Sequence, residues 1–248
     1  MSGHNRWAKV KHVKAKQDVI KGKLFTKAIK ELTIAAKNGG ADPSTNAALR
    51  VGIQKAKDIN MPQDTIKKAI QRGTGELPGV TYEELTYEGY GPGGCAIIVD
   101  VLTDNKNKAV AEIRYLFDRN GGKMADSGAV SYMFKKKSCF TVSKEKTSED
   151  MLMGIVLDAG AEDIKDIGDE FEITGEPGAF EAIKAALDNA KIEVLSNEIT
   201  KLPDTYVTLN KNEAEKMLKL EDALEEYDDV QDVYSNYDMD DATMEALA

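Results

Sequence analysis

Residues 2–17 combine cationic side chains with an aromatic ring. Arg6 and four lysines lie two or three positions apart, and the only tryptophan of the chain, Trp7, stands beside them. Cationic side chains neutralise phosphates, and an aromatic ring between them stacks on a nucleobase. The alternative is that Trp7 and Val10 anchor the segment on a neighbouring core, because an aromatic side chain buries about 150 Å² or more. The two interpretations are compatible, since an anchored ring fixes where the cations point. The cations are Arg6, Lys9, Lys11, Lys14 and Lys16.

Side chains for catalysis or metal binding are scarce. The only histidines, His4 and His12, lie in this basic segment, so the rest of the chain cannot assemble a Ser-His-Asp triad or a His-Glu-x-x-His zinc site. The two cysteines, Cys95 and Cys139, lack the spacing of a metal site and are too few for a disulfide framework, which favours a reducing compartment. We therefore predict that the protein is not an enzyme and uses no metal, no cofactor and no small-molecule substrate.

Residues 89–94, GYGPGG, match the letters of the dinucleotide-binding pattern G-x-G-x-x-G. That pattern must follow a strand and open a helix, so that the helix N-terminus faces the pyrophosphate. Here an apolar, β-branched run begins at Cys95, which predicts a strand after the glycines. We interpret the segment as a tight turn with an interface role, and its candidate contact residues are Gly91, Gly93 and Gly94.

A second glycine-rich segment, residues 120–128, is longer than the usual connection of about 2–6 residues between a helix and a strand. Loops of that length often bind a partner, and Gly121, Gly122 and Lys123 are the candidate contact residues. The alternative is a helix C-cap followed by slack chain.

The charges are segregated along the chain. Residues 1–75 hold 16 of the 33 lysines and arginines but only 5 of the 43 acidic residues, so the net charge of -10 divides into +11 for this part and -21 for the rest. Such asymmetry indicates a nucleic-acid-binding part on an acidic body, although lysines can also be merely solvated.

Three short helices are predicted in the basic part. Apolar residues at helical spacing span residues 18–37, a second helix restarts at Asp42-Pro43, and a third runs from Pro62 to Gly73. They add candidate nucleic-acid contacts on the first helix and on the third. The third helix offers no set of base-reading side chains, so we expect contacts to phosphates. The added residues are Lys21, Lys23, Lys27, Lys67, Lys68 and Arg72.

The acidic part predicts two α/β units. Residues 138–195 read as βαββαβ, the ferredoxin-like order. A second such set is cut in two around it, with strands at 95–102, 129–134, 206–209 and 230–234. The predicted fold class is α+β, an N-terminal three-helix domain followed by two ferredoxin-like α/β domains, one inserted in the other. The predicted domains are 1–78, a split domain of 79–136 and 201–238, an insert of 137–200, and a solvated acidic tail of 239–248.

Apolar runs are too short to cross a bilayer, which needs about 20 residues. The N-terminus carries lysines where a signal peptide needs an apolar stretch. We therefore expect a cytoplasmic protein with no membrane contact.

Several motifs spread along the whole chain resemble the YebC/PmpR family. They are Gly3-His4 with Trp7-Ala8, KGKLFTK at 21–27, NGGADP at 38–43, NMPQD at 60–64, YEGYGPGG at 87–94 and TDN at 103–105. The sequence departs from the usual family form of the second glycine segment at Ala125 and Ala129, where Gly and Ser are common.

The resemblance implies an N-terminal helical domain, two α/β domains and a non-enzymatic role in gene expression. Bacterial members are commonly described as transcriptional regulators that bind promoter DNA. The mitochondrial relative activates translation of cytochrome c oxidase subunit I, and some bacterial relatives are implicated in helping ribosomes through proline-rich stretches. The expected partner is therefore promoter DNA or, alternatively, the ribosome and its rRNA.

Overall fold

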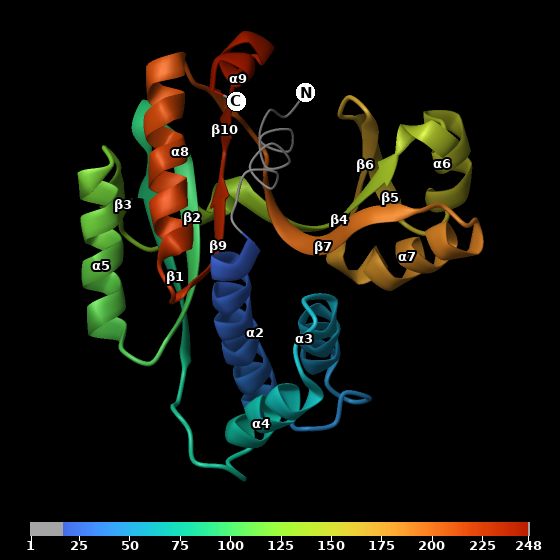
Figure 1. Ribbon diagram of the computed structural model, residues 1–248. Coiled ribbons are helices and arrows are strands. Elements are labelled where there is room, and N and C mark those ends of the chain that lie inside the picture. Colours follow the sequence, from blue (N-terminus) through green and yellow to red (C-terminus); the bar gives the residue numbers. More distant parts are fainter. Residues whose placement is uncertain (1–16, 248) are drawn as a thin grey trace.

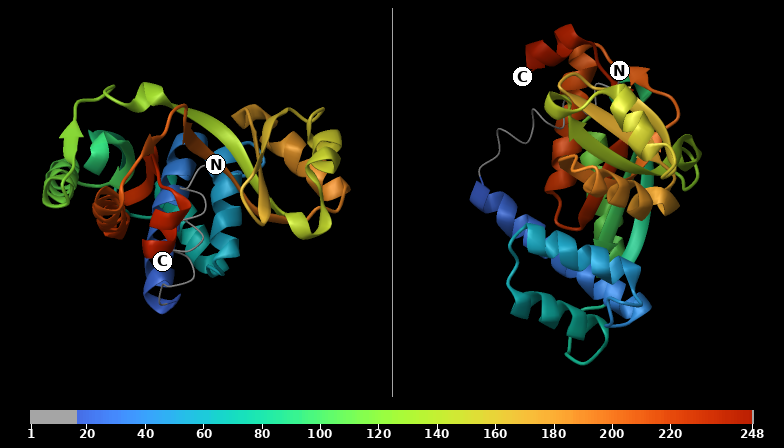
Figure 2. Two further views of the ribbon diagram at one scale, coloured as in Figure 1. Left: turned by 90° about the horizontal axis from the view of Figure 1, so that it is seen from above. Right: turned by 90° about the vertical axis from the view of Figure 1, so that its right-hand side faces the viewer.

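The computed structural model describes residues 17–247 and contains three N-terminal helices followed by two antiparallel sheets with their covering helices (Figure 1). This confirms the predicted α+β class. The two sheets lie at opposite ends of the molecule, and the helical domain lies beneath the junction between them (Figure 2).

The helical domain consists of α2 (Gln17–Gly39), α3 (Ala47–Asp58) and α4 (Gln63–Gly73). Leu32 and Leu49 are fully buried at its centre. Buried Asn46 caps α3 by accepting from the Leu49 N–H, and its amide group donates to the carbonyls of Ala35 and Gly40. One side chain therefore fixes the end of α2 against the start of α3.

The outer domain has a sheet in the order β3-β1-β2-β9, formed by β1 (Glu83–Tyr90), β2 (Ala96–Thr103), β3 (Lys123–Ala125) and β9 (Val230–Ser235). Helices α5 (Lys106–Arg119) and α8 (Lys211–Glu226) cover one face and bury Ile113, Phe117 and Met217 against it. The strands β8 (Val207–Thr208) and β10 (Tyr237–Asp238) pair with each other apart from this sheet.

Two strand assignments of the outer domain are corrected by the structure. The strand predicted at 129–134 is instead a 3-10 turn, Ser131–Met133, leading into β4. Val130 and Phe134 are buried against Ala96 and Ile98 of β2, on the face of the outer sheet that α5 and α8 do not cover. Their apolar character therefore reflects this packing and not a strand. Strand β1 was not predicted, because GYGPGG was the only strong sequence signal near it. The strand predicted at 206–209 corresponds to β8, which pairs with β10 and lies outside the four-stranded sheet.

The inserted domain contains β4 (Phe134–Ser143), α6 (Glu149–Val156), β5 (Ala161–Asp166), β6 (Glu170–Gly175), α7 (Phe180–Asn189) and β7 (Val194–Pro203). Its sheet order, β5-β6-β4-β7, is the ferredoxin-like order predicted for this stretch. Phe140, Ile173 and Leu187 are fully buried between the sheet and the two helices. The long strands β4 and β7 run side by side from the outer domain into the inserted one (Figure 1).

The acidic C-terminal segment is more ordered than the sequence suggested. Residues Asp241–Leu247 form helix α9, and Met244 and Leu247 pack against the core of the outer domain. Met239 just before it is buried. The prediction of a solvated tail was wrong here, because these three apolar residues have a hydrophobic surface to cover.

We predict that a fragment spanning 134–203 unfolds in one cooperative transition, and that a fragment spanning 137–200 is less stable. The shorter fragment loses the strand pairing of Phe134 with Pro203, of Lys135 with Leu202 and of Lys136 with Lys201. Urea unfolding followed by circular dichroism would compare the two. A longer fragment without a cooperative transition would show that the inserted domain depends on its neighbours.

Candidate nucleic-acid interface

Three lysines of helix α2, Lys23, Lys27 and Lys30, make hydrogen bonds to the acidic body of the protein. The Lys23 ammonium donates to the carbonyl of Glu226 at 3.3 Å, and the Lys27 ammonium donates to the carbonyl of Gln231 at 3.1 Å. Desolvation by burial lowers the pKa of Lys27, against the attraction of nearby carboxylates. Both side chains were predicted to contact nucleic acid, and in the structure each is half-buried and makes a hydrogen bond within the molecule.

Lys30, one turn further along, makes the strongest of these contacts. Its ammonium lies 2.5 Å from the Asp229 carboxylate and also donates to the carbonyls of Asp228 at 2.9 Å and Leu102 at 3.3 Å. The Lys30 and Asp229 side chains are only 8% and 16% exposed. The ammonium is therefore held by three acceptors in a nearly water-free position.

Asp229 collects further donors from the outer domain. The hydroxyls of Thr103 and Tyr227 both donate to its carboxylate, at 2.8 and 3.0 Å. Burial alone raises the pKa of Asp229, but the hydrogen bonds from Lys30 and Thr103 outweigh burial and lower it. Thr103 thus helps to hold the carboxylate that binds Lys30 of the helical domain, while Asn105 caps α5.

The cations of helix α4 face solvent. Lys67, Lys68 and Arg72 are all exposed, whereas Ile66 and Ala69 of the same helix are buried. None of the three cations forms an ion pair with another residue in the range 17–247. Lys37, Arg50 and Lys57 are further exposed cations of the same domain. This domain therefore presents a solvent-facing basic surface, which we call the α4 surface for its Lys67, Lys68 and Arg72.

The remaining predicted contacts lie at the start of the chain. Lys21 lies in helix α2. The six basic-segment residues Arg6, Trp7, Lys9, Lys11, Lys14 and Lys16 lie outside the described residues.

The structure brings the two glycine-rich segments together. Tyr90 pairs with Lys123 between β1 and β3, and a Cβ on Gly121 would lie 4.0 Å from the Pro92 ring. The first segment is a 3-10 turn, Pro92–Gly94, followed by a strand, so the prediction of a tight turn rather than a dinucleotide site is confirmed. Both segments lie at the same end of the outer sheet.

The glycines of this pair of loops serve two different purposes. A Cβ on Gly91 would lie 2.7 Å from the Met217 sulfur, and one on Gly122 would lie 2.9 Å from the Tyr90 carbonyl oxygen, so these glycines allow close packing. Gly94 and Gly121 have φ angles of 77° and 79°; a Cβ on Gly94 would meet open space, and one on Gly121 would meet only the Pro92 ring, at 4.0 Å. Gly93 also has a positive φ, and a Cβ there would collide with the Leu209 side chain. Of the predicted loop contacts, Gly93, Gly94, Gly121 and Lys123 are exposed, whereas Gly91 is buried and Gly122 is half-buried.

A buried carboxylate that the sequence analysis missed holds the second loop in shape. Glu88 is 5% exposed, and its carboxylate accepts hydrogen bonds from the N–H groups of Gly128, Val130 and Ser131 at 2.7 to 2.8 Å. Burial raises the pKa of Glu88, but these three bonds outweigh burial and lower it. A glutamate before the GYGPGG segment gave no signal in the sequence, because its donors lie about forty positions away.

The anchored loop presents an exposed aromatic side chain. Tyr132 follows the residues held by Glu88 and is 75% exposed. Tyr90, 41% exposed, donates its hydroxyl to the Ala129 carbonyl at 3.3 Å. We call Tyr132, Gly121 and Lys123 the loop surface of the outer domain.

The inserted domain lacks a stacking face of its own. In RNA-recognition modules of ferredoxin-like topology, aromatic residues on the open face of the sheet stack on bases. The positions facing away from α6 and α7 on the two central strands are Cys139, Thr141, Glu172 and Thr174. A buried carboxylate and no aromatic ring argue against that kind of RNA binding.

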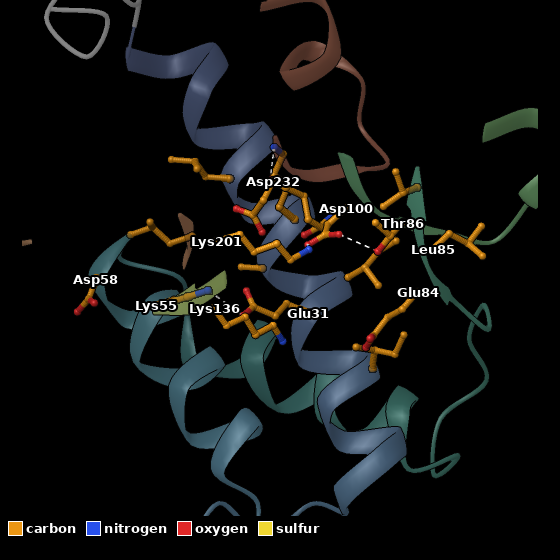
Figure 3. Close-up of a pocket in the computed structure, with 18 residues that line it drawn as sticks. Glu31, Lys55, Asp58, Glu84, Leu85, Thr86, Asp100, Lys136, Lys201 and Asp232 are labelled. Carbon is orange, nitrogen blue, oxygen red and sulfur yellow. Dashed lines mark hydrogen bonds and ion pairs between the residues drawn. The ribbon is translucent and has the colours of Figure 1, made fainter. Parts of the chain in front are cut away.

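A cleft of about 800 Å³ lies where the three domains meet (Figure 3). Its walls carry carboxylates and lysines in similar numbers, and the Asp100 carboxylate accepts from both Thr86 and Lys201 while Lys55 pairs with Glu31 at 3.0 Å. Enclosure by the walls raises the pKa of Asp232. Within residues 17–247 no group of three or more potential ligands is placed to bind a metal. This mixed lining is typical of a joint between domains, and it offers no concentrated positive charge for a phosphate.

Comparison with known proteins identifies the family. The family model described as the TACO1/YebC protein N-terminal domain matches residues 5–76, and the model of the TACO1/YebC second and third domain matches residues 82–237. The chain belongs to the TACO1/YebC family. Two family members named "probable transcriptional regulatory protein" are similar over nearly their whole length. The one from Desulfosudis oleivorans is 50% identical, covering 99% of this chain and 100% of the relative. The one from Acidobacterium capsulatum is 51% identical, covering 97% of each chain.

A solved structure has the same overall arrangement. The crystal structure of a conserved hypothetical protein from Aquifex aeolicus matches with a TM-score of 0.81 and 39% identity, covering 92% of this chain and 94% of that one. Among the helices in the described part of the chain, none is long and apolar enough to cross a bilayer.

We predict that Glu88→Gln loosens the loop around residues 128–131. Glutamine replaces one acceptor oxygen by an NH2 group that faces the N–H donors, and an unpaired buried donor costs about 1–3 kcal/mol. Amide hydrogen exchange at Gly128, Val130 and Ser131 should accelerate, whereas Glu83→Gln, an exposed change on the same strand, should leave these amides unchanged.

The same loop should loosen in acid. Because the pKa of Glu88 is lowered in the folded protein, its contribution is complete above the ordinary glutamate pKa of about 4.3 and is lost as pH falls through the lowered value. Equal exchange rates in parent and Glu88→Gln protein at neutral pH would contradict the anchoring role.

Proposed function

We propose that this protein is a non-enzymatic regulator of gene expression that binds nucleic acid through the basic surface of its N-terminal domain, with DNA as the first candidate. The single observation that carries the proposal is the division of cations within that domain. Lys23, Lys27 and Lys30 are occupied by the acidic body, while Lys67, Lys68 and Arg72 face solvent without ion-pair partners in the range 17–247. The names of the relatives, probable transcriptional regulatory proteins, support a regulatory role.

The charge distribution favours one orientation toward a polyanion. The part of the chain after residue 75 has a net charge of -21 and repels phosphates, so association would be steered to the helical domain. The solvent face of α4 holds cations rather than a set of base-reading amides, which suits phosphate contacts. We therefore expect binding with strong dependence on salt and little dependence on sequence from this surface.

We predict that changing Lys67, Lys68 and Arg72 to glutamine weakens binding to duplex DNA by about tenfold or more at moderate salt. Loss of three phosphate contacts should also reduce the slope of log affinity against log salt by about 2.7. A matched control changes the exposed Lys211, Lys216 and Lys219 of α8 to glutamine, which alters the net charge equally. Fluorescence anisotropy over a series of potassium chloride concentrations would measure both quantities. Equal losses in the two variants would refute a localised α4 surface.

A second candidate function is action on the ribosome through RNA. The observation that favours it is the loop surface, where exposed Tyr132 follows a backbone fixed by Glu88 and exposed Lys123 lies in strand β3. An exposed aromatic ring on a rigid support stacks on an unpaired base, and open glycines let RNA approach the backbone closely. Duplex DNA offers no unpaired base to such a ring.

We predict that, if this second function holds, the protein sediments with ribosomal particles after DNase treatment, and that Tyr132→Ala reduces the bound fraction. Tyr115→Ala, a change of a 52% exposed tyrosine on α5, serves as the control. Substitution of Gly122 is unsuitable as a test, because a side chain there would collide with Leu220 and the Tyr90 carbonyl. Sucrose-gradient fractions would be probed with antibody at near-physiological salt. A protein that leaves the ribosomal fractions once DNA is digested would exclude this function.

A further inference from the structure

Helix α6 of the inserted domain exposes apolar side chains that its own core does not use. Met153 is 47% exposed and Leu157 is 62% exposed, and they lie one helical turn apart on the same side of the helix. Leu152 and Val156 of the same segment are fully buried in the domain core. The exposed pair therefore forms a separate apolar strip on the surface.

A small cavity opens beside this strip. It has a volume of about 140 Å³ and lies between α6 and the edge strand β5, with Met153, Leu157, Val156, Ala161 and Ile164 as its apolar lining. At about 30 Å³ for each water molecule, the volume corresponds to roughly five waters. That is below the range of about 300–1,000 Å³ typical of small-molecule sites, so the cavity suits one inserted side chain.

The rim of the cavity is acidic. Glu149, Glu162 and Asp163 line it, and no lysine or arginine does. Glu162 is paired with Lys137, and Asp163 lies 3.7 Å from the Lys165 ammonium, whereas Glu149 and the exposed Asp158 have no ion pair within the described part of the chain. An apolar strip with such a rim is complementary to an apolar side chain flanked by cations.

The neighbouring strand restricts the form of the partner. Strand β5 is the edge of the inserted sheet, but its register is broken between Ala161 and Asp163, and Lys165 and Asp166 are exposed on it. An irregular, charged edge opposes the addition of another strand. A helix that lays its apolar face on Met153 and Leu157 meets no such obstacle.

We propose that the surface formed by Met153, Leu157, Glu149 and Asp158 docks a basic amphipathic helix of a protein partner. One apolar side chain of that helix fills the cavity, and its lysines or arginines face the acidic rim. The flexible methionine side chain adapts to the inserted group. This surface goes beyond the proposed nucleic-acid function, because its carboxylates repel phosphates and it belongs to a different domain from the α4 surface.

The test uses the full-length protein and a synthetic amphipathic helical peptide made of leucine and lysine. A peptide of the same composition in a scrambled, non-amphipathic order controls for simple charge attraction to an acidic protein. With 13C-methyl methionine labelling, the Met153 signal should shift on adding the amphipathic peptide at physiological salt and should shift much less with the scrambled one.

Variants locate the contact. In a titration of fluorescently labelled peptide followed by anisotropy, Met153→Ser combined with Leu157→Ser should weaken peptide binding by about tenfold or more, because a few anchor side chains dominate interface affinity. Leu195→Ser, which removes a 48% exposed leucine from β7, should change the affinity less than twofold by the same titration. Thermal unfolding of each variant would verify that both remain folded.

Three outcomes would overturn the proposal: no shift at Met153, equal binding of the two peptides, or equal affinity of the two variants. Self-association of the parent protein in sedimentation equilibrium that disappears in the Met153 and Leu157 variant would also overturn it, because the occupant would then be a second copy of the chain. DNA binding by the same variant should equal that of the parent, so failure of this proposal and failure of the nucleic-acid function are distinguishable.

Discussion

The contact between Lys30 and Asp229 determines how the rest of the molecule is arranged. An ammonium and a carboxylate that are both nearly removed from water must satisfy each other, and removal of one partner of such a pair typically costs about 3–5 kcal/mol. The carbonyls of Leu102 and Asp228 and the hydroxyls of Thr103 and Tyr227 complete the hydrogen bonding. Helix α2 is therefore held in one orientation on the outer domain, and this orientation decides which of its lysines reach solvent.

The segregated charges therefore hold the domains together as well as providing a surface for binding. Part of the positive charge of the helical domain attaches that domain to the acidic body, through Lys23, Lys27 and Lys30. Exposed cations of this domain that form no ion pair within the described part of the chain are Lys37 at the end of α2, Arg50 and Lys57 of α3, and Lys67, Lys68 and Arg72 of α4. A count of lysines therefore overstates the charge available to a polyanion, whereas the orientation of the domain makes the available charge directional.

In the outer domain, residues that pack closely also hold exposed residues in place. Gly91 and Gly122 let β1, β3 and α8 approach closely, and this packing supports the neighbouring open positions Gly94 and Gly121. Glu88 then fixes the backbone that leads to Tyr132. An exposed ring on such a support loses little conformational freedom when it stacks, which favours binding by a preformed surface. The inserted domain, acidic and without aromatic residues on its open face, is better suited to a protein partner than to RNA.

The sequence by itself determined the helices of the basic domain, the ferredoxin-like order of residues 138–195, the turn in the GYGPGG segment and the split of charge along the chain. These features depend on neighbours within about one helical turn or one strand, and local spacing records them. Only the tertiary structure decided that Lys30 is buried against Asp229, that Glu88 anchors a loop and that residues 83–90 form a central strand. The reason is that each depends on partners far along the chain. Lys30 and Asp229 are separated by 199 positions, and Glu88 and Val130 by 42. A lysine that binds phosphate and one that binds a buried carboxylate look the same in a sequence, because the residue type fixes the charge and only the fold fixes its partner.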